Sequence, residues 1–574
     1  AALGAALAAG VAGGAGFYAQ QQARTCMGFE ARLAGIWDEE VKARAQAAFD
    51  ATGLVYAADS WRSAAGRLDD YTQQWVTARR EACEATQRGE QSGELLDLRM
   101  ACLDERRQHV RATAALLEAA DRDVVSKASD TVAGLPGLDL CADIKALAAE
   151  QPPPEDPAVA ARVVELDRQI IEARALERAG KYERGLDLAA AVVAEVAELG
   201  YEPLQVRAWL AQGKLQGAKG AYAEAEATQE RAYASAVGLN MVPEAAEAAS
   251  AQVFVVGHRL ARHEDGRRWA KDAGPLARAV GTAEAETRFL GNLGLVAWDE
   301  GKLDQARAHL ERALAIREKA LGPAHLELAF PLNNLGNVTL AEGNLEQARA
   351  YHERALAIWE EALGPDHPNL ANPLNNLGNV AEKEGKFDQA RAYLERSLAV
   401  REKALGLDHP NLAIPLTNLG KVALAEGKLD QARAHYERAW ILCEKALGPD
   451  HPNLAYPLTG LGETLLAMGS PADALPPLER ALNGTPGLFR LRSISLFGLS
   501  SVTLTFNEGV DPLIARQQVL ERSSQAELPE DVKPSSRQYP WIRFEYDDKD
   551  KLHRQAVEVE NLSFAYPGSD KKIF

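Results

Sequence analysis

Residues 332–373 read LNNLGNVTLAEGNLEQARAYHERALAIWEEALGPDHPNLANP, and this stretch decides the fold because the chain repeats it. The following residues, 374–415, keep the same pattern, and Leu-Gly dipeptides recur at one constant interval, with their glycines at Gly294, Gly336, Gly378, Gly420 and Gly462. A fixed period of this size indicates an array of small units that bury their apolar faces against their neighbours. The sequence therefore predicts an all-α solenoid over residues 281–486, whose regular repeat has the length of the quoted stretch.

Each repeat is expected to be a pair of helices, here called helix A and helix B. Small residues recur at fixed positions in the pair, as in Gly336, Gly343, Ala348 and Ala355. They would let helix A and helix B approach closely and leave Gly343 at the turn between them. Residues 159–280 show a degenerate form of the same pattern, with turns at Gly180 and Gly220 and a third repeat around residues 254–269. About eight repeats are expected in all.

These small-residue positions resemble those of the tetratricopeptide family, whose usual repeat is about 34 residues. The extra length comes from the connector LGPDHPNLA at 363–371 and 447–455, which closely resembles the repeats of kinesin light chains and their bacterial relatives. The resemblance implies a right-handed superhelix of helix pairs whose concave wall consists of A helices. It also implies a non-catalytic module that binds a protein or an extended peptide in that groove.

By the same resemblance, three positions of helix A face the groove or its edge. An amide carries both a donor and an acceptor and suits the backbone of an extended peptide. Asn is also a poor helix former, so its recurrence there needs a reason; solvated polar positions copied by repeat duplication are the alternative. The predicted groove residues are Asn333, Asn334, Asn337, Asn375, Asn376, Asn379, Thr417, Asn418 and Lys421.

Histidines also recur once per repeat, at His325, His367, His409 and His451. Packed helix layers lie roughly 10 Å apart, whereas the ligands of one shared metal ion lie about 2 Å from it. A metal stripe is therefore a poor interpretation. We expect these residues to help start helix A, together with the proline that follows three of them.

The sequence predicts no catalytic site, metal site or cofactor. Lys+Arg number 64 against 82 Asp+Glu, a net charge of −18, which argues against nucleic acid as the main partner. No Gly-Lys pair is followed by Ser or Thr, so there is no P-loop, and no zinc-protease helix, nucleophile elbow or kinase signature set occurs. The sequence sets no oligomeric state.

The N-terminal part precedes a Pro-rich linker at 151–158. Residues 1–20 are mostly small and apolar, and we expect a truncated transmembrane helix or an export segment there. Residues 21–150 predict a bundle of long helices, the first with Phe29, Leu33, Ile36, Trp37 and Val41 on one face. Cys26, Cys83, Cys102 and Cys141 could form two disulfides outside the cytoplasm, or remain buried thiols inside it.

After the solenoid the character changes, and a small α/β tail is expected. Residues 487–532 contain the strand-like run SISLFGLSSVTLTF and a helix at 511–522, and 492–522 resembles the porter domain of heavy-metal efflux pumps of the resistance-nodulation-division class. Residues 533–574 resemble the linker and opening strand of ABC-F ATPases but contain no Walker A sequence. A fused tail is the favoured interpretation, and a genuine cap on the solenoid is the alternative.

The order of membrane exit, cysteine-bearing bundle and solenoid resembles the extracytoplasmic part of myxobacterial-type membrane serine/threonine kinases. This resemblance implies a sensory or scaffold arm that is anchored to the membrane and lies outside the cytoplasm. A cytosolic scaffold is the alternative, and a fragment of an ABC ATPase or an efflux pump is a minor one.

Overall fold

The computed structural model describes residues 26–143, 147, 154–449, 451–470, 473–474, 476–477, 480, 488–496 and 499–506. It divides into two compact units, residues 1–373 and 374–574. The predicted membrane segment at 1–20, residues 151–153 of the linker, the helix at 511–522 and the ABC-F-like piece lie outside the described residues. Among the helices that are described, none combines the length and apolarity needed to cross a membrane.

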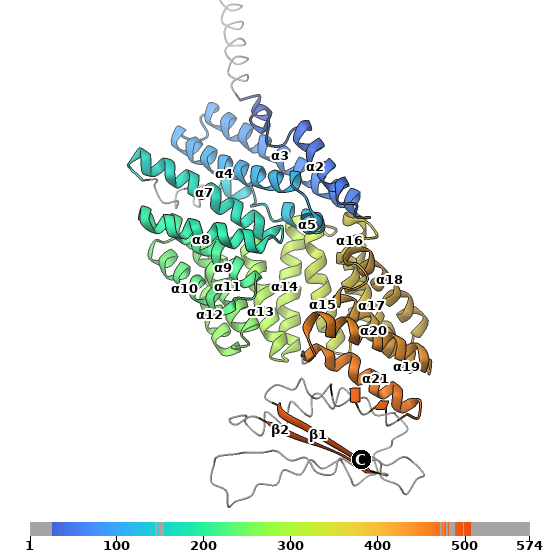
Figure 1. The fold of residues 1–574 in the computed structure, drawn as a ribbon. Coiled ribbons are helices and arrows are strands. Elements are labelled where there is room, and N and C mark those ends of the chain that lie inside the picture. The colour runs from blue at the N-terminus through green and yellow to red at the C-terminus, as the bar shows by residue number, and fades with distance from the viewer. Residues whose placement is uncertain are drawn as a thin grey trace, which may run out of the picture. The chain divides into compact units, whose positions relative to one another are not determined.

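The first unit begins with a helical bundle, as predicted (Figure 1). Its elements are η1 (Phe29–Leu33), α2 (Glu39–Ala51), α3 (Ala57–Gln87), α4 (Gly93–Glu118), α5 (Arg122–Ala133) and η2 (Asp139–Ala142). Trp75 is fully buried, and its indole Nε1–H donates to the Leu103 carbonyl at 2.6 Å. Disulfides join Cys26 to Cys83 and Cys102 to Cys141. The four cysteines thus tie η1 and η2 to the long helices.

The prediction of one continuous helix through Phe29 and Val41 is wrong. Gly35 has a φ of 69°, and Asp38 caps α2 by accepting hydrogen bonds from the backbone N–H groups of Glu40 and Val41. A left-handed glycine followed by an N-cap residue ends one turn and starts another helix. The apolar residues of this stretch nevertheless reach the core, since Trp37 and Val41 are both buried.

The rest of the first unit is a stack of helix pairs. The A helices are α7 (Pro157–Arg178), α9 (Glu202–Ala218), α11 (Val242–Gln252), α13 (Ala283–Asp299) and α15 (Ala329–Ala341). The B helices are α8 (Tyr182–Leu199), α10 (Tyr222–Gly238), α12 (His263–Val280), α14 (Leu303–Leu321) and α16 (Leu345–Leu363), and a π-helical turn η3 (Val253–Arg259) extends α11. Helix α7 begins two residues before the predicted start at 159, because Asp156 caps it.

The second unit continues the pattern with α17 (Ala371–Lys383, which straddles the boundary), α18 (Phe387–Leu405), α19 (Ala413–Ala425), α20 (Leu429–Leu447) and α21 (Ala455–Ala467). A two-stranded antiparallel sheet follows, β1 (Leu488–Leu496) with β2 (Leu499–Phe506). The strand-like run predicted in the tail therefore belongs to two paired antiparallel strands. The all-α solenoid, the bundle before it and strands in the tail are confirmed.

The small-residue positions work as predicted. A methyl group at Gly336 of α15 would lie 2.4 Å from Cε1 of His352 on α16, and one at Gly378 would lie 2.6 Å from Cγ of Leu394. Only glycine lets the two helices of a repeat come this close. At the turns between helices A and B, Gly180, Gly220, Gly301 and their equivalents have positive φ. The third degenerate repeat has Ala261 at this position, with a φ of 53°.

The bundle packs on the solenoid within the first unit at widely separated repeats. Nζ of Lys181, in the turn between α7 and α8, lies 2.5 Å from Asp121 and 2.7 Å from Asp123 at the start of α5. Arg207 of α9 lies 3.1 Å from Glu105 of α4. Helix α3 also packs on α16, several repeats further along the chain. The bundle therefore joins repeats that are not neighbours.

Candidate functional site

The predicted groove residues of the first unit lie on α15. Asn333 is buried, and its Oδ1 lies 3.2 Å from Nδ1 of His352, so this amide faces helix B of its own repeat. Burial lowers the pKa of His352 to about 4 and keeps the ring neutral at physiological pH, against a smaller opposing hydrogen bond to Gly336. Asn334 and Asn337 are half-buried.

In the second unit the predicted residues lie on α17 and α19. Nδ2 of Asn418 donates to Oδ1 of Asn375 at 2.9 Å, which joins two successive A helices through their amides. Asn375 is buried, while Asn376, Asn379, Thr417 and Asn418 are half-buried. Among the described residues, Asn379 has no hydrogen-bond partner. Its amide is thus available to a ligand.

The asparagines Asn375, Asn376, Asn379 and Asn418 are called the amide wall below. Lys421 adds a cation beside this amide wall. Its Nζ lies 3.4 Å from Oε2 of Glu382 on α17, and its side chain is 41% exposed. The Thr417 hydroxyl donates to the Ala413 carbonyl at 2.7 Å, which uses the donor within α19. The second unit therefore brings together the amide wall and a lysine–glutamate pair. Such a surface can hydrogen-bond a peptide backbone.

The periodic histidines are structural, as expected. In each connector the histidine Nδ1 accepts a hydrogen bond from the backbone N–H two residues later, at 3.4 Å for His325, 3.2 Å for His367, 3.1 Å for His409 and 3.2 Å for His451. The bond caps a short 3₁₀ turn that leads directly into helix A. No group of three or more metal-ligating side chains occurs among the described residues.

A charged cluster on the A helices of the first unit was missed at the sequence level. Arg174 of α7 and Lys214 of α9 lie 3.4 Å and 2.7 Å from Oε1 of Glu247 on α11. Burial would raise the pKa of Glu247, but the two cations outweigh it and hold this pKa well below its usual range. The three positions do not follow the interval of the regular repeats, so the repeat pattern gives no signal for them.

Arg207 of α9 joins the A helices of the first repeats to the bundle. It lies 3.0 Å from Asp167 and 3.1 Å from Glu105 of α4. Burial raises the pKa of Asp167, and Arg207 opposes that effect. Burial also lowers the pKa of His109, beside Glu105, to about 4. The A-helix face of the first repeats is thus already paired with the bundle of the same chain.

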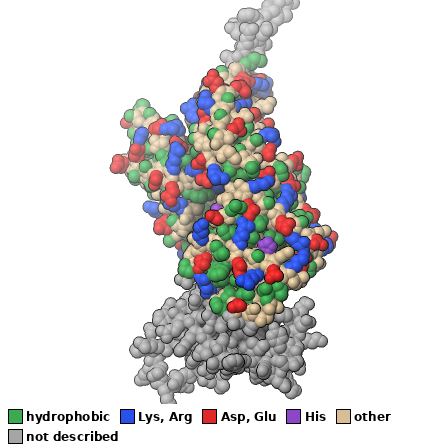
Figure 2. Space-filling model, turned by 45° about the vertical axis from the view of Figure 1, so that its right-hand side comes forward, with side chains coloured by type: hydrophobic (Ala, Val, Ile, Leu, Met, Phe, Trp, Pro, Cys, Tyr) green, Lys and Arg blue, Asp and Glu red, His purple; other side chains and the backbone are tan. Residues whose placement is uncertain are grey.

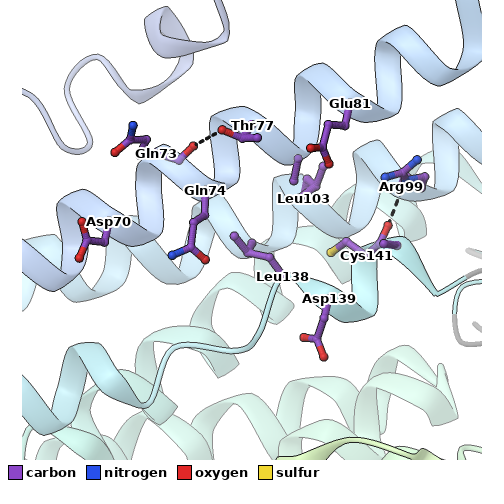
Figure 3. Close-up of a pocket in the computed structure, with 12 residues that line it drawn as sticks. Asp70, Gln73, Gln74, Thr77, Glu81, Arg99, Leu103, Leu138, Asp139 and Cys141 are labelled. Atoms are coloured by element: carbon purple, nitrogen blue, oxygen red, sulfur yellow. Dashed lines mark hydrogen bonds between the residues drawn. The ribbon is translucent and has the colours of Figure 1, made fainter. Parts of the chain in front are cut away.

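A hollow of about 490 Å³ lies in the bundle between α3, α4 and η2 (Figure 3). Arg99 crosses one end, where its Nε donates to the Cys141 carbonyl at 3.3 Å and its Nη1 donates to Gln91 at 2.8 Å. Its lining is mixed: Asp70, Gln73, Gln74, Thr77, Ala78, Glu81, Arg99, Leu103, Leu138, Asp139, Cys141 and Ala142. Polar and apolar groups both line it, and three carboxylates outnumber the one guanidinium.

The face of the molecule drawn in Figure 2 shows no large area of one charge. Basic and acidic side chains alternate over it, with apolar side chains scattered between them. Such a mixed surface is expected where helices turn their polar faces to water.

Comparison with known proteins identifies the repeats. The tetratricopeptide repeat model matches residues 284–341, 327–403, 370–440 and 411–486. Residues 284–486 are tetratricopeptide repeats. These repeats form a protein–protein interaction scaffold, a fold that is typically non-catalytic.

Similar solved structures include a kinesin-light-chain-type protein of Podosopora anserina with nearly identical TPR-like repeats (24% identity, 34% of this chain and 92% of that one, TM-score 0.30). They also include BtubC (BKLC) of P. vanneervenii (22% identity, 45% of this chain and 97% of that one, TM-score 0.32). A third is PilF of Pseudomonas aeruginosa (20% identity, 42% of this chain and 91% of that one, TM-score 0.31).

The tail matches a different family. Residues 472–540 match the AcrB/AcrD/AcrF family model. A cobalt-zinc-cadmium resistance protein CzcA of Cupriavidus metallidurans and a cation efflux system protein CzcA of Alcaligenes sp. are each 46% identical to this chain over 61 residues. The match covers 10% of this chain and only 6% of either relative, so it spans a small piece of an efflux protein.

Proposed function

We propose that α17 and α19 bind an extended peptide segment of a protein partner. The observation that carries this proposal is the amide wall of the second unit, where Asn418 is bonded to Asn375 and Asn379 is left without a partner among the described residues. A peptide backbone offers alternating donors and acceptors, which are the groups that an unpaired amide can satisfy. Lys421 and Glu382 would then select charged side chains of the partner.

A displayed library of random extended peptides, selected on the full chain, tests this proposal. We expect Asn379→Ala and Lys421→Ala each to weaken the selected peptides about tenfold or less, the loss of one or two hydrogen bonds. Gln389→Ala removes an exposed amide from α18 and is the matched control. Peptides that bind both wall variants as tightly as the wild type would refute the proposal.

We further propose that the chain is the sensory or scaffold arm of a membrane-anchored signalling kinase, with the solenoid outside the cytoplasm. The two disulfides of the bundle support an oxidising compartment, because disulfides persist there and are rare in the cytosol. A cytosolic scaffold is the competing function. A kinase in the reading frame upstream of Ala1 would support the receptor, and a nearby start codon would contradict it.

Thiol titration separates the same two functions. Protein from its native source, denatured without reductant, should show one reactive thiol, that of Cys443, if the bundle cysteines are oxidised. Reactive thiols on all five cysteines would favour the cytosolic scaffold.

A further inference from the structure

The connectors between repeats offer a second interaction surface, apart from the groove. The connector at 364–370 reads GPDHPNL, the one at 448–454 is identical, and the one at 406–412 differs only by Leu407. All three start with a glycine at a φ of 82° to 87° and contain the same histidine-capped 3₁₀ turn. The chain therefore builds the same surface element more than once.

One of these elements is already occupied by a helix of the same chain. The Tyr56 ring, at the start of α3, meets the His367 ring edge-on with centroids 5.2 Å apart, and both residues are 2% exposed. The His367 ring also hydrogen-bonds the backbone of Ser126, while its Nδ1 accepts from the Asn369 backbone. One aromatic ring and one helix thus cover the histidine of this connector.

A carboxylate completes the contact. Oδ2 of Asp59, one turn after Tyr56, lies so near Gly364 that a methyl group there would be only 2.3 Å from it. Helix α3 thus presents an aromatic ring and a carboxylate three residues apart, and the connector receives both.

The equivalent leucines show what this contact covers. Leu363, which ends α16 at this connector, is 1% exposed, whereas Leu321, Leu405 and Leu447 at the same position of other repeats are 39%, 38% and 38% exposed. In the second unit, Leu407, Ile414 and Tyr456 are also exposed, at 66%, 49% and 57%. The second unit therefore offers apolar surface at two connectors built like the one that α3 covers.

We propose that the second-unit connectors, residues 405–412 and residues 447–449 with 451–454, dock a helical segment of a separate protein. The segment carries an aromatic residue and, three positions later, Asp or Glu, as Tyr56 and Asp59 do on α3. The aromatic ring of the docked segment lies against His409 or His451, and its carboxylate lies over the glycine that starts the connector. Apolar side chains of the segment cover Leu405 and Leu447. A second copy of this chain does not fit, because its own Tyr56 is buried against its own connector.

A labelled helical peptide with the sequence of residues 53–69 is the probe, titrated into the full chain by fluorescence anisotropy. We expect saturable binding and hydrogen-exchange protection of amides in 405–412 and 447–454. Leu405→Glu with Leu447→Glu should weaken binding at least tenfold, while Ile441→Glu, at an exposed apolar site within α20, should leave it unchanged. Peptides carrying Tyr56→Ala or Asp59→Asn should also bind at least fivefold more weakly.

Several results would overturn the proposal. Absence of binding, or binding that the paired leucine variant leaves unchanged, would do so. Protection confined to 364–370 would show that the peptide only exchanges with α3. Self-association of the chain that Leu405→Glu abolishes would instead assign the surface to a second copy. Circular dichroism melts of each variant show that the fold is kept, since all three substituted side chains are exposed.

Discussion

Nδ1 of His352 lies 3.2 Å from Oδ1 of Asn333, across the interface between the two helices of one repeat. The sequence pattern places Asn333 in the groove, but its amide serves a buried histidine. Asn375, at the same repeat position, serves Asn418 instead. One repeat position therefore has two different structural environments, and the predictions below separate structural amides from ligand-binding ones.

Asn333→Ala should lower the free energy of unfolding by about 1–3 kcal/mol, because it removes the side-chain partner of Nδ1 of the buried His352. Asn379→Ala should change stability by less than about 0.5 kcal/mol, since Asn379 has no partner among the described residues. Urea denaturation of both variants checks this contrast. Equal losses would mean that Asn379 is structural as well.

The buried histidines should make the first unit acid-sensitive. The pKa values of His352 and His367 are lowered to about 4 by burial, below the value of about 6.5 for an unfolded chain. Between these values the unfolded state binds more protons, so stability is fully present above pH 6.5 and falls as the pH drops toward 4. Each histidine contributes on the order of 3 kcal/mol to this loss. Chemical denaturation from pH 7 to 4.5 measures it.

Variants at one repeat position test the cause of this pH dependence. Leu310 and Leu394 stand where His352 stands in its own repeat. His352→Leu should remove the His352 share of the pH dependence of the first unit and leave the shares of His367 and His109. Leu394→His should introduce a dependence like that of His352 into the second unit. A pH profile unchanged by either substitution would place the titrating group elsewhere.

The sequence predicts the repeat fold well because its signals are local and periodic. Gly336, Gly343 and His367 each recur once per repeat, and the close helix approach, the turn and the 3₁₀ cap that they form are local. The contacts of Arg207 with Glu105 and of Tyr56 with His367 join residues far apart in the chain, and no spacing encodes them. The break at Gly35 was missed because side-chain periodicity continues through it. The role of the amide wall as a binding site remains a prediction.

Ala261→Gly should stabilise the third degenerate repeat by about 1 kcal/mol. Ala261 holds a φ of 53° at the turn where other repeats have glycine, and a left-handed conformation costs an L-residue roughly 1–2 kcal/mol. The greater entropy of glycine in the unfolded chain offsets part of this gain. Gly301→Ala, at the same turn position and in open space, should lower the free energy of unfolding by a similar amount. Thermal melts of both variants should therefore shift in opposite directions.

Reduction should loosen the bundle. The disulfides close loops of 57 and 39 residues, so each should contribute about 4 kcal/mol by restricting the unfolded chain. Melting with and without dithiothreitol, followed by hydrogen exchange of α3 and α4, measures the loss. Burial raises the pKa of the Cys443 thiol, so this residue should stay unreactive until the second unit unfolds. Melting that reductant does not change would show that the disulfides constrain little.

The contacts of the bundle with distant repeats also have a mechanical consequence. A solenoid in which each repeat touches only its neighbours stretches like a spring, because small rotations add up along the stack. In the first unit, Lys181 is tied to Asp121 near the start of the stack, and His367 is tied to Tyr56 several repeats later. Contacts that join distant repeats oppose these rotations and make the stack between them stiffer. We therefore expect the repeats between these two contacts to move together when the first unit is pulled at one end.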